Sequence, residues 1–202
     1  MADYKSNGLM GLSHYRNSRV SQELMEPLYL NIFTVQIALP ASLGVTAQDT
    51  NLLLEGVKNV SGLETHKMPS AVAEQKYKYA NRSFAGARPT NTSIDVKLDF
   101  EVNLNYKGTD KPNNFTVKML RSWCDLVFDP LTGSTGLKKD YIAPYITVTM
   151  QDRAGNPFWG WILYDVFPTT ALPAPALDYN SDSLYTVSGF TLRCDHWNEV
   201  ML

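Results

Sequence analysis

The sequence predicts a mainly β domain with one α-helix, and three observations lead to this fold class. Residues 93–106 alternate apolar and polar side chains, which is the period of a strand with one buried face. Only residues 115–127 repeat apolar side chains at helical spacing, and segments rich in proline and glycine separate the other apolar runs. With 202 residues and 44% hydrophobic content, we expect a single domain over residues 1–202.

The first part of the chain is predicted to hold an arm, a strand and a long excursion. Residues 1–27 are polar and aperiodic, so we expect an N-terminal arm that becomes ordered only against a neighbour. Residues 28–38 are rich in β-branched and aromatic side chains and end before Pro40, which predicts a strand. Residues 41–72 carry a weaker pattern, which we interpret as a long loop with short strands. Residues 75–84 follow as a more polar strand.

The clearest element is the long strand predicted over residues 93–106. Its apolar side chains occupy every second position, and the usual strand has only about 5 to 6 residues. A strand of this length indicates a tall sheet or a barrel wall. The polar side chains that alternate with the apolar ones are Asp95, Lys97, Asp99, Glu101, Asn103 and Asn105.

One helix is predicted over residues 115–127. Its apolar side chains recur at three- and four-residue spacing, so they form a stripe that covers an open end or face of the sheet. Asn113 or Asn114 is placed to cap the start of the helix, and the pair Asp129 and Pro130 ends it.

The second half of the chain is predicted to be a hairpin, a long loop and a final strand. Strands over residues 144–150 and 158–167 are joined by QDRAGNP, which supplies turn residues. The second of these strands, FWGWILYDVF, is apolar at nearly every position, so we expect both of its faces to be buried. Residues 168–183 contain three prolines and form a long loop. Residues 184–197 form the last strand.

Charge and cysteine content restrict the function classes. The formal net charge is −2, from 18 basic and 20 acidic residues, so the chain has no overall attraction to nucleic acid or to an anionic membrane. The first residues lack the apolar run of a signal peptide, and no stretch approaches the roughly 18 apolar residues of a membrane helix. Cys124 and Cys194 lack metal-binding spacing, and we interpret both as buried thiols in a reducing compartment.

Candidate catalytic residues are few. His14, His66 and His196 lie outside recognisable catalytic motifs, and adjacent side chains on a strand point to opposite faces, so Asp195 cannot orient His196 directly. Residues 133–139, GSTGLKK, lack the spacing of a phosphate-binding loop. We therefore predict that the protein is not an enzyme and has no cofactor.

Metal and nucleic-acid sites are also not predicted. Asp95, Asp99 and Glu101 alternate along one strand face instead of crowding a loop, which favours a solvated face over a metal site. No basic residues interleave with Trp159 and Trp161, so we assign the tryptophans to the core and not to a stacking platform. The tryptophans of the chain are Trp123, Trp159, Trp161 and Trp197.

The order of these features resembles the tail-tube family of contractile phages, which includes the inner tube protein of T4-like phages. The resemblance covers about residues 28–198. It is carried by ALP at 38–40, by RSFAG at 82–86 leading into SIDVKLDFEVN, by the helix and by the hairpin. The most specific parts are FPT at 167–169, LDYNS at 177–181 and the strand that ends in DHW at 195–197. The arm, residues 41–72 and the loop with APAP depart from compact family members.

The resemblance implies a β-sandwich or half-barrel subunit that completes a large β-barrel when six copies form a ring, with rings stacked into a hollow tube. Closing copies into one barrel would also satisfy exposed strand edges. The implied partners are further copies of the chain, the tail sheath, the tape-measure protein, a baseplate or tube initiator, and DNA in transit, with no membrane anchor. The implied location is the virion tail, after assembly in the host cytoplasm.

The polar side chains of residues 93–106 are the candidate lumen lining. The six residues sum to −2, and a mildly acidic wall would let DNA slide, because tight phosphate binding comes from Lys and Arg. The same face is equally compatible with an outer surface. We expect residues 41–72 and the arm to contact neighbouring rings. The long loops over residues 41–72 and 168–183 are both expected to take part in contacts between subunits.

Two alternative functions remain open. The chain could be the tube subunit or tube initiator of a related contractile injection system. From a different class, a carbohydrate-binding β-sandwich would also be rich in strands, with Tyr77, Tyr79 and Trp159 along its groove.

Overall fold

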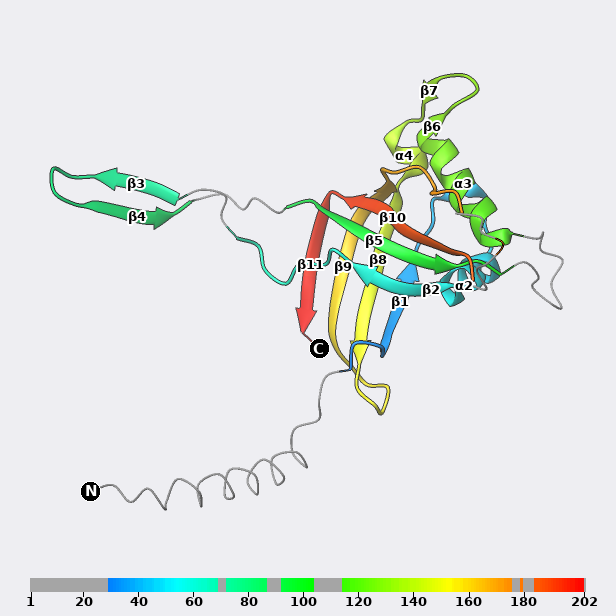
Figure 1. The fold of residues 1–202 in the computed structure, drawn as a ribbon, viewed down its shortest axis with the longest axis horizontal. Helices are drawn as coiled ribbons and strands as arrows, with labels where there is room; N and C mark the ends of the chain where they lie inside the picture. Colours follow the sequence, from blue (N-terminus) through cyan, green and yellow to red (C-terminus); the bar gives the residue numbers. More distant parts are fainter. Residues whose placement is uncertain are drawn as a thin grey trace, which may run out of the picture.

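The computed structural model describes residues 29–68, 72–86, 92–103, 114–175, 179 and 184–201. Within these ranges the chain is mainly β with one main helix, which confirms the predicted fold class (Figure 1). The elements are β1 (Phe33–Ile37), η1 (Ala41–Leu43), α2 (Ala47–Glu55), β2 (Val57–Ser61), β3 (Val72–Lys76), β4 (Asn81–Ala85), β5 (Ile94–Glu101), α3 (Phe115–Val127), β6 (Phe128–Asp129), β7 (Ser134–Thr135), α4 (Lys138–Tyr141), β8 (Ala143–Gln151), β9 (Pro157–Pro168), β10 (Thr186–Cys194) and β11 (His196–Met201).

The main sheet is an open half-barrel. Its strands are antiparallel and follow the order β1-β8-β9-β10-β5-β2, with β11 also paired to β9. In the described part of the chain the sheet does not close, so β1 and β2 form its two ends. Figure 1 shows β11, β9, β8 and β1 running nearly upright while β5, β10 and β2 cross them. The sheet thus folds over on itself and encloses a core.

The fold in the sheet lies at Asp165 and Asp195. One antiparallel register joins β9 to β10 and then to β11, and in this register the two aspartates lie directly across from each other. Asp165 adopts a positive φ of 53°, and Asp195 separates β10 from β11. The final strand predicted over 184–197 is therefore two strands, because the chain bends here to follow both halves of the sheet.

The core fills the space inside the half-barrel. The alternating apolar side chains of β5 are buried, as predicted, and Phe100 meets Phe190 of β10 edge to face at 6.2 Å between ring centroids. Helix α3 has the predicted bounds and buries Leu120 and Trp123 against this core. The indole nitrogen of Trp123 donates to the carbonyl of Tyr141 at 2.7 Å, which attaches α4 to the same core.

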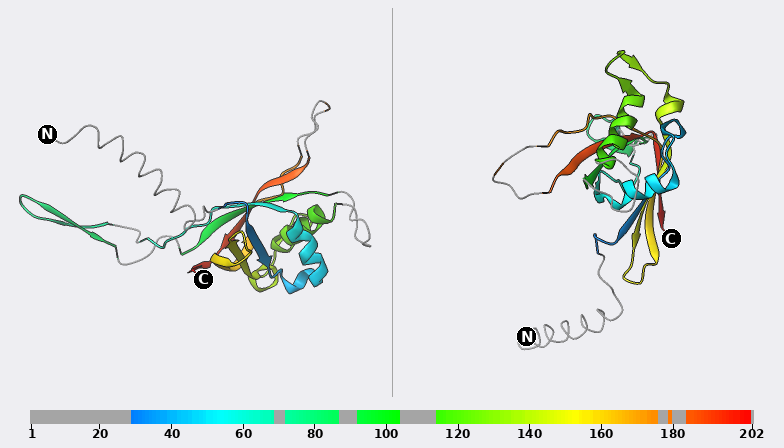
Figure 2. Two further views of the ribbon diagram at one scale, coloured as in Figure 1. Left: turned by 90° about the horizontal axis from the view of Figure 1, so that it is seen from below. Right: turned by 90° about the vertical axis from the view of Figure 1, so that its right-hand side faces the viewer.

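Residues 41–72 contain an unpredicted helix, α2. Thr46 and Asp49 form a capping box in which the Asp49 amide donates to the Thr46 hydroxyl and the Thr46 amide donates to the Asp49 carboxylate. Leu53 of α2 is fully buried, whereas residues 41–72 were predicted to be a long loop with short strands. Figure 2 shows α2 and α3 together on one side of the sheet. None of the helices in the described ranges has the length and apolarity needed to span a membrane.

The predicted strand over 75–84 is a hairpin. Strands β3 and β4 pair from Val72 with Ala85 to Lys76 with Asn81, and the Tyr77 amide donates to the Ala80 carbonyl at the tip. All ten strand residues are exposed. Figures 1 and 2 show the hairpin projecting away from the half-barrel.

The hairpin of β8 and β9 is confirmed, with Gly155 at a φ of 83° in its turn. The prediction that β9 is buried on both faces is wrong in part. Trp161 and Leu163 face the core, but Ile162 and Tyr164 on the other face are only half-buried.

Candidate functional site

The polar face of β5 is the candidate lumen lining, and the structure places it on the outside of the half-barrel. Asp95 and Lys97 are exposed, and Asp99 and Glu101 are partly exposed, while their neighbours in sequence are buried. Asn103 follows the strand and is exposed. Asn105, the last of the predicted lining residues, lies outside the described residues.

Neighbouring strands add two cations to this face. Lys58 of β2 forms an ion pair with Glu101 at 2.6 Å, and Arg193 of β10 contacts both carboxylate oxygens of Asp95 at 3.1 Å. The sequence reasoning did not find these partners, because the register that brings β2 and β10 beside β5 is not readable from local patterns. Such exposed pairs contribute only about 0–1 kcal/mol each to stability. They matter here because they change the charge of the face.

The third carboxylate of the face is held by hydrogen bonds. The Asn59 side chain donates to one oxygen of Asp99 at 3.0 Å, and the Gly189 amide donates to the other at 2.6 Å. Gly189 lies in a register shift of β10 between Val187 and Phe190, where the ladder to β5 is interrupted. The Asp99 carboxylate thus satisfies a backbone donor that the bulge leaves unpaired.

The charges of the face balance when the three strands are counted together. Asp95, Asp99 and Glu101 supply three negative charges, and Lys58, Lys97 and Arg193 supply three positive charges. The sum of −2 predicted for β5 alone is therefore not the charge of the whole face. Among the described residues, Lys97 forms no ion pair, so it is the cation of this face that is free to contact a passing anion.

Strand edges form the second notable feature. In the described ranges β1 pairs with β8 only, β2 with β5 only, and β11 with β9 only, so each has one side without a strand partner. Edges of this kind present backbone donors and acceptors to any further strand. The predicted exposed edges are thus present.

Residues 62–68 cross from β2 to the other half of the sheet. The Glu64 carbonyl accepts a hydrogen bond from the Trp161 indole at 2.9 Å, and the Lys67 ammonium lies 5.2 Å from the Trp197 ring centroid. Both tryptophans are buried, and the half-buried Trp159 packs against Trp161 with tilted rings at 4.7 Å between centroids, which supports the predicted core role.

The residues that could have carried chemistry are engaged elsewhere. Asp195 pairs with Lys138, and this hydrogen bond raises the pKa of Lys138, while His196 stacks on Tyr164 at 5.9 Å. Burial raises the pKa of the Cys124 thiol to about 11, so it is protonated at neutral pH. Among the described residues, no three potential ligands of the types His, Cys, Asp and Glu come together in a metal-binding group.

The three aromatic residues predicted to line a carbohydrate-binding groove are not brought together in one copy. Tyr77 and Tyr79 lie at the tip of the β3–β4 hairpin, whereas Trp159 lies on β9 in the half-barrel. Figure 1 shows these elements far apart. A single groove lined by all three side chains is therefore not formed by one copy.

Comparison with solved structures finds the same fold in chains of contractile assemblies. The chain matches a tube-terminating cap of the anti-feeding prophage with a TM-score of 0.57 and 14% identity, over 88% of this chain and 93% of that chain. It matches a chain of the sheath-tube complex of the extracellular contractile injection system PVC with a TM-score of 0.56 and 18% identity, over 91% and 97%. The chain therefore shares its fold with chains of these two contractile assemblies.

A third match is a chain of the PVC sheath/tube terminator, with a TM-score of 0.54 and 17% identity over 87% of this chain and 98% of that chain. No protein-family profile matches the sequence, and no curated protein matches it. The similarity is therefore one of fold, and in each comparison it extends over most of both chains.

Proposed function

We propose that the protein is a structural subunit of the inner tube of a contractile phage tail, built from stacked hexameric rings whose lumen conducts DNA. The carrying observation is the shared fold with the PVC sheath-tube complex, which extends over 91% of this chain and 97% of that one. The shared fold extends over nearly all of both chains, so it is not confined to a short submotif, and this supports a common structural role. The tube of a related injection system is the same structural role with a different cargo.

The open half-barrel supports this role on physical grounds. A sheet whose end strands β1 and β2 lack a second partner gains hydrogen bonds and buries apolar surface when further strands cover those edges. Ring closure supplies such strands from identical neighbours, so each copy is completed by another. In the described residues the sheet of a single chain stays open, and assembly with neighbouring copies would close it.

The polar face of β2, β5 and β10 is proposed as the lumen wall. Tight phosphate binding requires an excess of Lys and Arg that releases counterions, and here three carboxylates balance three cations. A DNA molecule in transit would meet Lys97 as a weak contact and would be held by nothing stronger. A balanced wall therefore favours passage over retention.

The proposed partners are further copies of the chain, a sheath protein, a tape-measure protein and a baseplate or tube initiator. The proposed location is the virion tail, after assembly in the host cytoplasm. Residues 41–72 and the N-terminal arm are proposed to contact neighbouring rings. We propose no catalytic role and no cofactor.

A second candidate is a tube terminator, because two of the matched structures are a tube-terminating cap and a sheath/tube terminator. A terminator adds one ring to an existing tube and stops growth. A tube subunit adds rings without limit once growth has begun.

Negative-stain electron microscopy of the purified protein over a concentration series tests these candidates. Hollow tubes of stacked six-fold rings support the tube subunit, and single six-fold rings that do not stack support the terminator. A protein that stays monomeric at high concentration, even with baseplate seeds added, refutes both. A thermal shift on adding oligosaccharides to that monomer would then favour the carbohydrate-binding module.

A further inference from the structure

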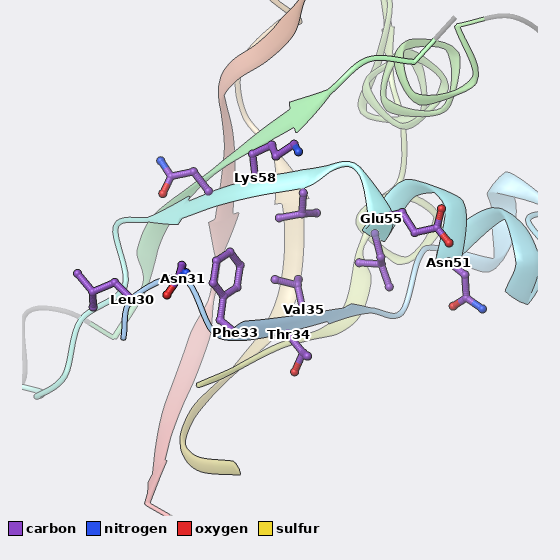
Figure 3. Close-up of a pocket in the computed structure, with 11 residues that line it drawn as sticks. Leu30, Asn31, Phe33, Thr34, Val35, Asn51, Glu55 and Lys58 are labelled. Carbon is purple, nitrogen blue, oxygen red and sulfur yellow. The ribbon is translucent and has the colours of Figure 1, made fainter. Parts of the chain in front are cut away.

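An apolar groove lies at the open side of the half-barrel, between the end strands β1 and β2. Its volume is about 800 Å³, and its apolar lining includes Phe33, Val35, Leu54 and Val57. Figure 3 shows Phe33 and Val35 extending from β1 toward β2. We call this groove the seam.

The seam leads toward the core. An adjoining cavity of about 230 Å³ is lined by Phe33 and Val60 at the surface and by Met150 and Trp161 further in. In the described ranges, side chains of the two end strands lie between this part of the core and the groove. Apolar surface left open in this way is characteristic of a binding site for another protein segment.

Backbone groups border the seam as well as apolar side chains. Within the described ranges β1 bonds only to β8 and β2 only to β5, so both strands turn an unpaired edge toward the groove. An extended segment laid between them would find backbone partners on either side and an apolar floor beneath. This combination is the recognition mode of strand addition.

The β3–β4 hairpin has the complementary properties. One face carries Ala73 opposite Phe84 and Gln75 opposite Arg82, with the Arg82 guanidinium 5.9 Å from the Tyr77 ring centroid. Phe84 is 53% exposed. An isolated two-stranded hairpin is at best marginally stable in water, so this hairpin requires a surface that covers it.

We propose that the β3–β4 hairpin of one copy lies in the seam of a second copy, with the free edge of β4 along one of the two end strands and Phe84 in the groove. The lengths agree, since β1, β2 and β4 each have five residues. The charges are also complementary. Residues 72–86 carry three cations and one carboxylate, and the seam is bordered by the exposed carboxylate of Glu55 and by Lys58, which is already paired with Glu101.

The donor and the seam belong to different copies. Figures 1 and 2 show the hairpin directed away from the half-barrel that carries its own seam. Each copy therefore has one donor surface and one separate acceptor surface. Contacts of this head-to-tail kind generate closed rings or open helices, unlike two-fold contacts, which stop at a dimer. The inference rests on the proposed self-assembly and names its contact.

Two blocking variants and their mixture test the contact. Phe84→Asp removes the donor and leaves the seam intact, and Val35→Asp places a charge in the seam and leaves the hairpin intact. Each variant alone should require at least a tenfold higher concentration to assemble, measured by sedimentation velocity. An equimolar mixture retains one functional hairpin and one functional seam per pair, so it should form dimers and nothing larger.

The matched controls are Ser83→Asp and Gln36→Asp, which add the same charge at neighbouring positions on the opposite strand face. Both should assemble like the unaltered protein. Thermal melting monitored by circular dichroism verifies that each variant is folded. If Val35→Asp does not fold, Phe84→Asp alone decides the question, because Phe84 lies on the exposed hairpin outside the core.

The outcomes separate this inference from the proposed function. If the unaltered protein forms rings and Phe84→Asp forms them equally well, the hairpin contact is wrong and the tube role stands. If both blocked variants fold but their mixture does not dimerise, the pairing of hairpin with seam is wrong. If the unaltered protein never assembles, the proposed function fails, and the contact fails with it.

Discussion

Gly62→Ala should destabilise the protein strongly, because Gly62 combines a left-handed backbone with a close approach. Its φ is 85°, which costs an L-residue roughly 1–2 kcal/mol. An added Cβ would also lie 2.3 Å from the backbone carbonyl oxygen of Asp95, so a backbone segment must move, at a cost of about 1–3 kcal/mol. The substitution also restricts the unfolded chain, which returns about 0.4–1 kcal/mol. We expect a net loss of about 2–4 kcal/mol.

Gly155→Ala is the matched control, since Gly155 has a φ of 83° but no atom within 4 Å of an added Cβ. Only the backbone cost applies there, so the net loss should be about 1 kcal/mol. Urea denaturation of dilute, unassembled protein measures both values, and thermal melting should separate the variants by several degrees, at about 2–4 °C per kcal/mol. Equal losses for the two variants would refute the close approach of Gly62 to Asp95 of β5.

Three further predictions concern the core, the polar face and a thiol. Trp123→Ala should lower the free energy of unfolding by about 3–5 kcal/mol, and Trp123→Phe, which keeps an aromatic ring in the core but loses part of the indole and its bond to the Tyr141 carbonyl, by clearly less; denaturant melts measure both. Arg193→Ala should cost less than about 1 kcal/mol, because its pair with Asp95 is exposed, and a larger loss in the same melts would contradict this assignment. Alkylation of Cys124 in the folded protein at pH 8 should be roughly a hundredfold slower than in urea, because its pKa is about 11, and labelling at the normal rate would contradict its burial. Since the pKa is raised on folding, the thiol's contribution to stability is present below its ordinary pKa of 9.0 and is lost as pH rises toward 11.

Elements with strong local periodicity were predictable. The alternation of residues 93–106 located β5 and its polar face, and the stripe of residues 115–127 gave the bounds of α3. Thr46 and Asp49 have the spacing of a capping box, which is a sequence signal for the start of α2, but the three consecutive leucines at 52–54 lack helical spacing. The tip of the β3–β4 hairpin lacked a glycine or proline, so one polar strand was predicted where the chain forms two.

The partners of the candidate site could not be predicted, because they depend on register between distant strands. Lys58, Asp95 and Arg193 belong to three different strands, and only the pairing of β2 and β10 with β5 brings their charges onto one face. The bend at Asp165 and Asp195 could not be predicted for the same reason. The two aspartates are 30 residues apart in sequence, and only the register of β9 with β10 and β11 places them across from each other.

The sequence by itself determined the strongly periodic elements, β5 and α3, and which of their side chains are buried, because periodicity is a local property of the chain. Only the tertiary structure decided that the sheet stays open between β1 and β2, that the polar face is electrically balanced, and that the β3–β4 hairpin stands free. These features arise from contacts between residues far apart in sequence, and their energies depend on distances that no local pattern encodes.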